Sequence, residues 1–368
     1  MTPQASPPRG FQASDRWGAW LAVISSERRG PAAALARAGL ALLAGAYRAG
    51  LAARNTWFRL PGTVVRAVRP VVSVGNLTVG GTGKTPFVAY LARMVQEMGG
   101  RPVILSRGYG AAAGGRNEEA LELSLLCPGV PHVQNPDRTA ALAQWAAENP
   151  CDVAILDDGF QHRRLARGLD IVLIDALRPF GFGHLLPRGL LREPPSALRR
   201  ADVLVITRAD LAGPESLAIL RRTLAQHTRQ GTPVLAAHHE AVAVLAADGS
   251  RRDIATLRRQ DVAAACGIGN SDAFLMTLER TGARVALSEA FPDHHAYTQA
   301  DLDRVMRAAE AAGLKTLVTT GKDFVKWQPL LAAGGRAAPL QVAALEVRLR
   351  VAEGEDVLRR KVGALLRP

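Results

Sequence analysis

Residues 71–86 read VVSVGNLTVGGTGKTP, and this stretch determines the class of fold. It starts with a short apolar run of strand type, 71–74. It continues as a glycine-rich loop and leads into 87–98, whose apolar side chains recur at helical spacing. A strand, a glycine-rich loop and a helix in this order form the context of a P-loop, which binds nucleotide phosphates. Thr78 stands where the G-x4-G-K-S/T pattern has its first glycine, so the loop is a variant Walker A motif.

The residue types in this loop suit a bound polyphosphate. Glycine has no Cβ, so the backbone N–H groups of the loop can turn inward around a phosphate. Lys84 supplies a mobile cation for the β and γ phosphates, Thr85 supplies a hydroxyl for Mg²⁺, and the helix adds its dipole. We therefore predict a nucleotide site at Gly80, Gly81, Gly83, Lys84 and Thr85. The alternative is a glycine-rich turn without function, which does not explain why Gly-Lys-Thr falls between a strand and a helix.

Further apolar strands follow, and they imply a mostly parallel sheet with helices on both faces. The strand 153–156 ends in Asp157 and Asp158, and an acidic strand end downstream of a P-loop is typical of a Walker B motif. Either carboxylate fits an Mg²⁺ ligand, directly or through water. The alternative for such a pair is a turn or a helix cap. The other predicted strands are 102–105, 171–174 and 203–206.

Composition limits the class of protein. The chain has 368 residues, 48% of them hydrophobic and 21% charged, which suffices for a sizeable core and more than one domain. Its three cysteines form no CxxC pair, which excludes a disulfide framework and a cysteine-based zinc ribbon and favours a reducing compartment. The net charge of +13 indicates an anionic partner: nucleic acid, a membrane surface or a phosphorylated substrate.

The amino-terminal part has an apolar helical pattern at 31–57. Its longest uncharged run, 38–47, is too short to span a bilayer, and residues 1–30 lack the pattern of a secretory signal. An apolar stripe with basic flanks and aromatic residues at its end is typical of a helix in a membrane interface. An amphipathic helix packed on a soluble core gives the same pattern. The stripe is Leu40, Leu43, Tyr47 and Leu51, the flanks are Arg37 and Arg48, and the aromatic residues are Trp57 and Phe58.

Several motifs occur in an order that resembles one family. They are SVGNLTVGGTGKTP (73–86), LSRGYG (105–110), DDGFQHRRLARGLDIVLID (157–175), LLPRGLLREP (185–194), TRAD (207–210), GIGN (267–270), FPDHHAYTQADL (291–302) and TTGKDFVK (319–326). From about residue 30 to about residue 330 the chain resembles the tetraacyldisaccharide 4′-kinases, the lipid A 4′-kinases of Gram-negative-type bacteria. The combination of motifs is specific, although each motif alone is not.

The resemblance implies an activity and its partners. It implies that ATP, with Mg²⁺, phosphorylates the 4′-hydroxyl of a tetraacylated disaccharide 1-phosphate. It also implies a peripheral or monotopic enzyme on the cytoplasmic face of the inner membrane, with no nucleic-acid partner and no obligate protein partner. The membrane-interface interpretation of 31–57 gains support, because a basic protein suits an anionic lipid substrate in an anionic membrane.

The resemblance also assigns roles to residues. The P-loop match adds Thr82 to the phosphate contacts, and the acidic pair matches at Asp157 and Asp158, with Asp158 in a catalytic role beside Lys84. Glu193 matches a further Mg²⁺-linked carboxylate. The positions that match the lining of the family's active-site cleft are Arg107, Tyr109, Gln161 and Arg192.

A general base follows from the same resemblance. In the family an Asp works with a His of the DHH-like segment to remove the proton of the 4′-hydroxyl. The histidine is His294, and the best alignment places Glu118 where the family has Asp. Glu119 and Glu122 are alternatives for this carboxylate, and the segment also reads as a solvated acidic start of a helix.

The predicted fold is α/β, with a P-loop NTPase-like core on a mostly parallel sheet, a membrane-interface helix and a smaller second α/β domain. In the smaller domain we expect strands at 242–245, 263–268 and 315–319 and helices at 271–281 and 299–312, and a final helix, 354–366, returns to the core. The predicted boundaries are 1–58 for the amino-terminal segment, 59–235 for the core, 236–345 for the smaller domain and 346–368 for the carboxy-terminal segment.

Two other classes of function are weighed against a kinase. A GTPase-like switch or a nucleic-acid-dependent motor also has a P-loop, and TRAD resembles the guanine-reading NKxD motif, but Thr207 and Arg208 replace its Asn and Lys. Aromatic residues are only 5% of the chain, and no aromatic-basic platform for bases is visible. A non-catalytic membrane-binding module does not explain Lys84, Thr85 and the acidic strand ends.

Overall fold

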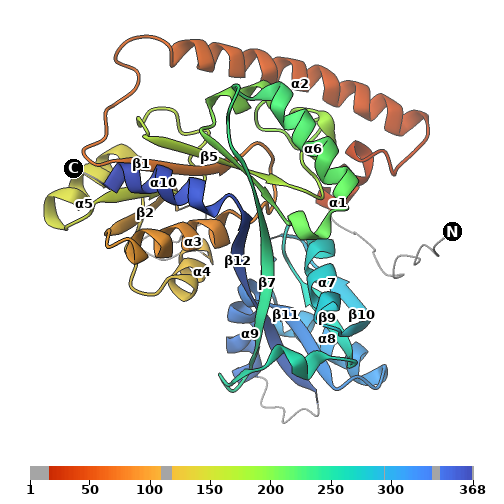
Figure 1. The fold of residues 1–368 in the computed structure, drawn as a ribbon. Helices are drawn as coiled ribbons and strands as arrows, with labels where there is room; N and C mark the ends of the chain where they lie inside the picture. Colours follow the sequence, from red (N-terminus) through yellow and green to blue (C-terminus); the bar gives the residue numbers. More distant parts are fainter. Residues whose placement is uncertain (1–15, 109–117, 294, 334–339, 367–368) are drawn as a thin grey trace. The chain divides into compact units, whose positions relative to one another are not determined.

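The computed structural model describes residues 16–108, 118–293, 295–333 and 340–366 (Figure 1). The chain divides into two compact units. The larger unit comprises residues 21–238 and 349–368, and the smaller comprises residues 239–348 with the first twenty residues. Because the larger unit is built from two separate stretches, its last part is made of residues far from the rest in sequence.

The sheet of the larger unit is parallel, with strand order β7-β6-β5-β1-β4-β2-β3. The P-loop strand β1 lies between β4 and β5, and all six of its residues are buried, as expected for an inner strand covered on both faces. All five predicted core strands are present. The strands are β1 (Val71–Asn76), β2 (Pro102–Ser106), β3 (His132–Gln134), β4 (Val153–Leu156), β5 (Leu169–Asp175), β6 (Val203–Thr207) and β7 (Val234–Ala246).

Helices cover both faces of this sheet, as Figure 1 shows for α3, α4 and α10 on one side and α6 on the other. Phe87 and Leu91 of α3 pack in one cluster with Leu358 and Val362 of α10, so the last helix completes the core beneath the P-loop helix. The helices are α1 (Arg16–Ile24), α2 (Pro31–Trp57), α3 (Lys84–Glu97), α4 (Glu118–Leu126), α5 (Arg138–Glu148), α6 (Pro214–His227) and α10 (Glu355–Leu366), with 3-10 turns η1 (Gly181–Gly183), η2 (Pro195–Arg200) and η3 (Ala209–Leu211).

The P-loop helix begins earlier than predicted. The sequence pattern gave 87–98, whereas α3 starts at Lys84, directly after Gly83 in the left-handed region (φ 83°). Pro86 is tolerated there because the first-turn N–H groups of a helix have no partner within it. The earlier start places Lys84 and Thr85 on the first turn.

The smaller unit is also α/β. Its parallel strands have the order β10-β9-β11-β12, and β8 (Arg251–Arg252) pairs antiparallel with β7. The chain enters this unit along β7 and leaves it along β12, each a strand of 13 residues, where the sequence indicated only 242–245. The mostly parallel α/β fold is therefore confirmed. The remaining elements are β9 (Asp261–Cys266), β10 (Arg284–Ala290), β11 (Thr316–Thr320), β12 (Gln341–Glu353), α7 (Ser271–Arg280), α8 (Gln299–Ala311), α9 (Gly321–Ala333) and η4 (Ile254–Leu257).

Helix α2 confirms the predicted helix but corrects its predicted apolar stripe. Leu51 is buried and Leu40 and Tyr47 are half-buried, so these three face the protein. Only Leu43 of the stripe is exposed. The exposed large apolar side chains of α2 are Leu35 (76%), Leu42 (79%), Leu43 (59%) and Trp57 (60%).

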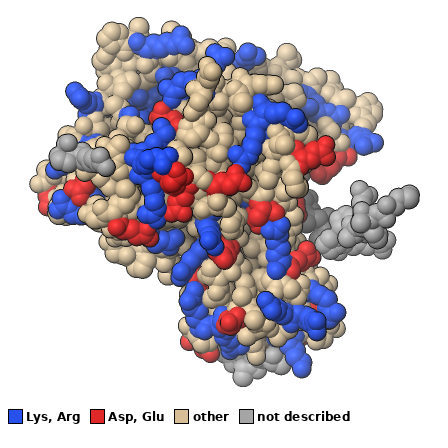
Figure 2. Space-filling view, viewed as in Figure 1, with Lys and Arg blue, Asp and Glu red and all other residues tan. Residues whose placement is uncertain are grey.

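The exposed apolar surface of α2 therefore lies on a different side of the helix from the predicted stripe. Leucines lie on both sides of the helix, and the sequence does not show which side the core covers. Figure 2 shows the surface along α2 as largely uncharged, interrupted by Lys and Arg side chains. Within the described part of the chain, α2 included, no helix combines the length and apolarity needed to cross a membrane.

Candidate active site

The P-loop follows the carboxyl end of β1 and has a hydrogen bond within its own backbone. Gly80 (φ 108°) and Gly83 have positive φ, and the Thr82 N–H donates to the Gly80 carbonyl (3.1 Å). The Thr82 hydroxyl is buried and has no hydrogen-bond partner among the residues that the structure describes. A buried hydroxyl of this kind is costly unless something accepts its proton, and a phosphate oxygen is a suitable acceptor.

Two neighbouring strands brace the loop. The Thr207 hydroxyl donates to the Thr82 carbonyl (3.0 Å), and Arg208 donates to the Gly81 carbonyl (2.9 Å). Arg208 also pairs with Asp175 at the end of β5 (2.7 Å), and both side chains are buried. The sequence alone does not predict this bracing role for the TRAD segment (207–210). The sequence did contain one signal for this role. Both β5 and β6 end in polar residues, at the edge where parallel sheets bind their ligands.

The Lys84 ammonium lies between two oxygens. Its Nζ is 3.3 Å from Asn76 Oδ1 and 3.7 Å from Asp158 Oδ1. The Asn76 amide in turn donates to the Thr78 carbonyl (2.8 Å), which fixes its orientation. Asn76 is therefore part of the site, although the sequence analysis did not select it.

Asp158 joins the P-loop to the predicted cleft residues. Arg192 Nη1 is 2.6 Å from Asp158 Oδ2, and it is 3.4 Å from Gln161 Oε1. Gln161 donates to the Asn76 carbonyl (2.9 Å). Burial raises the pKa of Asp158, but Lys84 and Arg192 outweigh burial and hold this pKa below its usual range, so the carboxylate is ionised at neutral pH. The structure thus brings together Lys84, Asp158, Gln161 and Arg192.

The predicted Mg²⁺ ligands fall into two groups. Thr85 lies half-buried on the first turn of α3, and Asp157 is buried directly after β4, where its N–H donates to the Leu105 carbonyl (2.9 Å). A hydroxyl and a carboxylate at this edge are oxygen donors of the type that Mg²⁺ prefers. The described residues include no group of three or more His, Cys, Asp or Glu side chains placed to hold a metal ion.

Glu193, the third predicted Mg²⁺-linked residue, lies in an internal ion pair. It is fully buried, with its oxygens 2.9 and 3.2 Å from Arg200 and 3.3 Å from Arg54. Arg200 also lies over the Phe160 ring, 4.2 Å from its centroid. Two guanidinium groups thus neutralise the carboxylate. This geometry is that of an internal ion pair, and the Mg²⁺-linked role of Glu193 stays a prediction. The sequence motif could not reveal the ion pair because Arg54 comes from the distant helix α2.

The structure describes the remaining predicted residues only in part. Arg107 is exposed after β2, whereas Tyr109 and His294 lie outside the described residues. Glu118 is the first residue of α4. The side chains of Glu118 and Glu119 are outside the description, and Glu122 is half-buried.

His295, the neighbour of His294, has structural contacts. Its Nε2 is 3.2 Å from Asp301 Oδ2, and its ring lies 4.8 Å from that of Phe291 and 4.9 Å from that of Tyr297. Asp301 also forms a capping box with Thr298 at the start of α8. His295 is thus engaged in packing and capping within the smaller unit, and of the two histidines His294 remains the candidate for chemistry.

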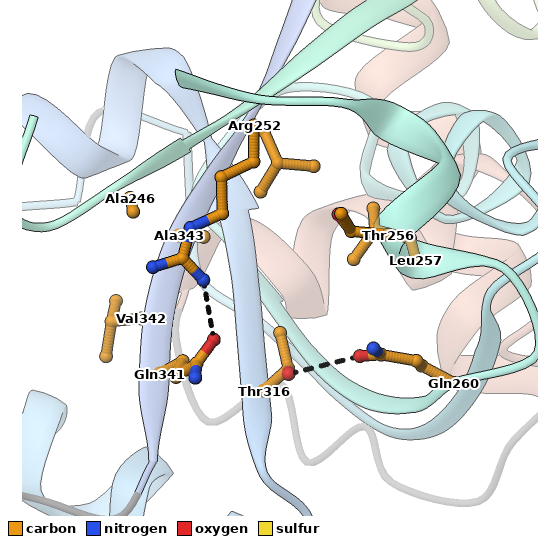
Figure 3. A pocket seen from close by; sticks show the side chains of 10 residues that line it. Ala246, Arg252, Thr256, Leu257, Gln260, Thr316, Gln341, Val342 and Ala343 are labelled. Atoms are coloured by element: carbon orange, nitrogen blue, oxygen red, sulfur yellow. Dashed lines mark hydrogen bonds between the residues drawn. The ribbon is translucent and has the colours of Figure 1, made fainter. Parts of the chain in front are cut away.

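Figure 3 shows a pocket of the smaller unit with a volume of about 270 Å³. Arg252 donates to Gln341 (2.9 Å), and Thr316 donates to Gln260 (3.4 Å). The other lining residues are Val244, Ala246, Thr256, Leu257, Val342 and Ala343. The lining includes none of the predicted site residues and no carboxylate or histidine.

Comparisons with known proteins agree with one another. Residues 36–367 match the family model described as tetraacyldisaccharide-1-P 4′-kinase. The tetraacyldisaccharide 4′-kinase of Anaeromyxobacter dehalogenans strain 2CP-1 is 45% identical over 368 residues, covering 94% of each chain. That of Geobacter sulfurreducens is 40% identical and covers 90% of this chain and 95% of its own. A crystal structure of the "apo" form of LpxK from Aquifex aeolicus in complex with ATP aligns with a TM-score of 0.67 at 29% identity, covering 90% of this chain and 99% of that one.

Proposed function

The chain belongs to the tetraacyldisaccharide-1-P 4′-kinase family, and from this premise we propose how its residues carry out the reaction. It is a kinase that transfers phosphate from ATP to the 4′-hydroxyl of tetraacyldisaccharide 1-phosphate in lipid A biosynthesis. Family membership removes the GTPase-like switch, the nucleic-acid motor and the non-catalytic membrane module from consideration. What remains to be proposed are the roles of individual residues, the metal and the contact with lipid.

The observation that carries the proposed roles is the Lys84–Asp158–Arg192 group at the mouth of the P-loop. Phosphoryl transfer is catalysed mainly by positioning and by stabilising charge on the transferred group. Lys84 binds the β and γ phosphates and leaves its contact with Asp158 as ATP enters. Arg192 and Gln161 then lie beside Asp158, where Arg192 can bind the transferred phosphoryl group. Gly80 to Thr85 supply the backbone donors.

Thr85 and Asp157 are the proposed Mg²⁺ ligands, with Asp158 nearby as an ionised carboxylate. When bound, Mg²⁺ neutralises charge on the phosphates and orients them. The fit rests on the chemistry of the donors: a hydroxyl of the P-loop and a carboxylate at the next strand end are the pair that P-loop NTPases use. The family resemblance makes Glu193 a further candidate, and two arginines pair with its carboxylate in this structure.

Glu118 and His294 are the proposed pair for removing the proton of the 4′-hydroxyl. The histidine takes the proton of the 4′-hydroxyl, and the carboxylate orients the imidazole and stabilises its charged form. This role comes from the family resemblance of FPDHHAYT and of the segment after LSRGYG. Arg107 and Tyr109 are proposed to line the substrate cleft on the same ground.

The lipid substrate requires access from a membrane surface. We propose that the exposed face of α2, with Leu35, Leu42, Leu43 and Trp57, lies in the membrane interface on the cytoplasmic side of the inner membrane. Leucine and tryptophan side chains bury apolar area at the boundary of headgroups and acyl chains, and basic residues add attraction to anionic lipids. This surface makes the enzyme peripheral or monotopic.

The experiment is transfer of ³²P from γ-labelled ATP onto tetraacyldisaccharide 1-phosphate in detergent micelles. Lys84→Ala should lower kcat by roughly two to four orders of magnitude, because charge stabilisation of the transferred group is lost. Lys315→Ala, on the smaller unit, is the matched control. A folded Lys84→Ala enzyme with nearly normal turnover would exclude the proposed role of the P-loop.

A further inference from the structure

Helix α2 contacts the segment that carries Arg192. The Tyr47 hydroxyl donates to the Arg192 carbonyl (3.0 Å), and the Arg54 guanidinium is 3.3 Å from Glu193, the next residue. Tyr47 and Arg54 are seven residues apart, which places them two turns apart on one side of the helix. Burial raises the pKa of Tyr47, so its hydroxyl keeps the proton that it donates.

The same segment is attached to the P-loop on its other edge. The Arg192 N–H donates to the Leu77 carbonyl (2.7 Å), and the Val79 N–H donates to the Leu190 carbonyl (2.8 Å). The backbone of Arg192 is therefore held by the P-loop through its N–H and by α2 through its carbonyl. Its side chain extends to Asp158.

Glu193 adds an ion pair to the contact between α2 and this segment. Its side chain is fully buried, so the two guanidinium groups of Arg54 and Arg200 must neutralise its charge. A further contact joins the end of α2 to the segment after Asp158, since Arg163 donates to the Asn55 side chain (2.9 Å). The contacts from α2 thus converge on both segments that hold the Asp158–Arg192 pair.

We propose that Tyr47 and Arg54 are positioning residues for the kinase reaction: they fix the Arg192–Glu193 backbone so that the Arg192 guanidinium stays on Asp158 beside Lys84. Helix α2, which exposes an apolar face, then also supports the catalytic site. This inference rests on the proposed roles of Lys84, Asp158 and Arg192, and it holds whether or not α2 contacts a membrane.

The first test uses Tyr47→Phe, which keeps the ring and removes the hydrogen bond. In micelles with saturating ATP and lipid, kcat should fall about threefold to tenfold, the range for one hydrogen bond, with KM for lipid unchanged. In an Arg192→Ala background the same change should have almost no effect on kcat, because Tyr47 acts through Arg192. Tyr90→Phe on α3 is the matched control.

The second test uses Arg54→Gln, with Arg48→Gln as its control. Both changes remove one positive charge from α2, but of the two arginines only Arg54 touches Glu193. Arg54→Gln should lower kcat roughly tenfold or more, because a buried carboxylate loses a partner. Arg54→Lys should restore most of the rate, and Arg48→Gln should keep it.

The inference is overturned if Tyr47→Phe keeps the wild-type kcat, or if it slows the Arg192→Ala enzyme as much as the wild type. It is also overturned if Arg54→Gln and Arg48→Gln behave alike. Failure of the proposed function has a different signature, which is an active Lys84→Ala enzyme. Pelleting with vesicles of phosphatidylethanolamine and phosphatidylglycerol, measured on the same variants, reports the membrane contact separately.

Discussion

Arg208→Met tests whether the strand ends determine the shape of the P-loop. Arg208 is 8% exposed, pairs with Asp175 at 2.7 Å and donates to the Gly81 carbonyl at 2.9 Å. Methionine fills a similar volume, so the main loss is charge and hydrogen bonding. Removing one partner of a buried ion pair costs about 3–5 kcal/mol, and Asp175 keeps one hydrogen bond from the Leu177 N–H, which favours the lower end.

Calorimetry measures the effect of Arg208→Met on stability, and enzyme kinetics measures its effect on ATP binding. A loss of about 3 kcal/mol lowers the unfolding midpoint by roughly 6–12 °C for a unit of this size. Losing the bond to Gly81 should raise KM for ATP about fivefold to tenfold. The double variant Arg208→Met/Asp175→Asn should recover most of the stability, because no buried charge is left alone, but not the KM for ATP.

The control and the refuting result are simple. Arg199→Met removes an exposed arginine next to Arg200 and should change neither quantity. If Arg208→Met unfolds within about 2 °C of the wild type and keeps its KM for ATP, Arg208 does not brace the loop. If the double variant restores the KM for ATP as well, the effect on binding comes from the uncompensated charge of Asp175 and the Gly81 contact has no role.

Three further outcomes are expected. Leu35→Ser with Leu42→Ser should weaken binding to anionic vesicles about tenfold or more in a sedimentation assay, because both side chains are largely exposed and apolar. Glu118→Gln and His294→Ala should each slow turnover severely, and together should be little worse than either alone, if they act as one unit. Asp170 has a pKa raised to about 6 by burial, so its stabilising contribution is complete below about pH 4 and is lost as the pH rises through about 6. Asp170→Asn should therefore lack this loss, which thermal unfolding between about pH 4 and 7 will show.

Each of these has a matched control. Leu125→Ser removes an exposed leucine from α4 (64% exposed), and vesicle binding that falls equally there would contradict the role of α2. Glu122→Gln should be close to neutral for turnover, and a damaging Glu122→Gln beside a harmless Glu118→Gln would move the carboxylate to Glu122. A wild-type and an Asp170→Asn stability curve that run parallel from pH 4 to 7 would argue against a titrating Asp170.

The sequence predicted those features that depend on local pattern. The strands of the core are continuous buried runs, and Gly83-Lys84-Thr85 lies between a strand and a helix, so both could be recognised without tertiary information. Lys84, Asp158, Gln161 and Arg192 are brought together as the family motifs implied.

Features that depend on remote partners could not be predicted. The motif that contains Glu193 does not show the arginines that pair with it, one of which, Arg54, is 139 positions earlier in the chain. The bracing role of Arg208 was not predicted because its contact with Gly81 crosses from β6 to the P-loop. The stripe of α2 fits both a membrane-facing and a core-facing helix in sequence, and only packing shows that Leu51 is buried while Leu43 is exposed.

The two-stretch construction of the larger unit has a consequence for biosynthesis. Leu349, Val351, Leu358 and Val362 share one core cluster with Phe87 of the P-loop helix, yet the whole of 239–348 is translated before them. While the ribosome makes those residues, the nucleotide-binding sheet is complete as far as β7 but has an uncovered patch where β12 and α10 will pack. This patch of the nascent chain can aggregate until the final helix emerges. Shortening that helix should therefore lower the yield of folded protein in the cell more than it lowers the activity of the protein that folds.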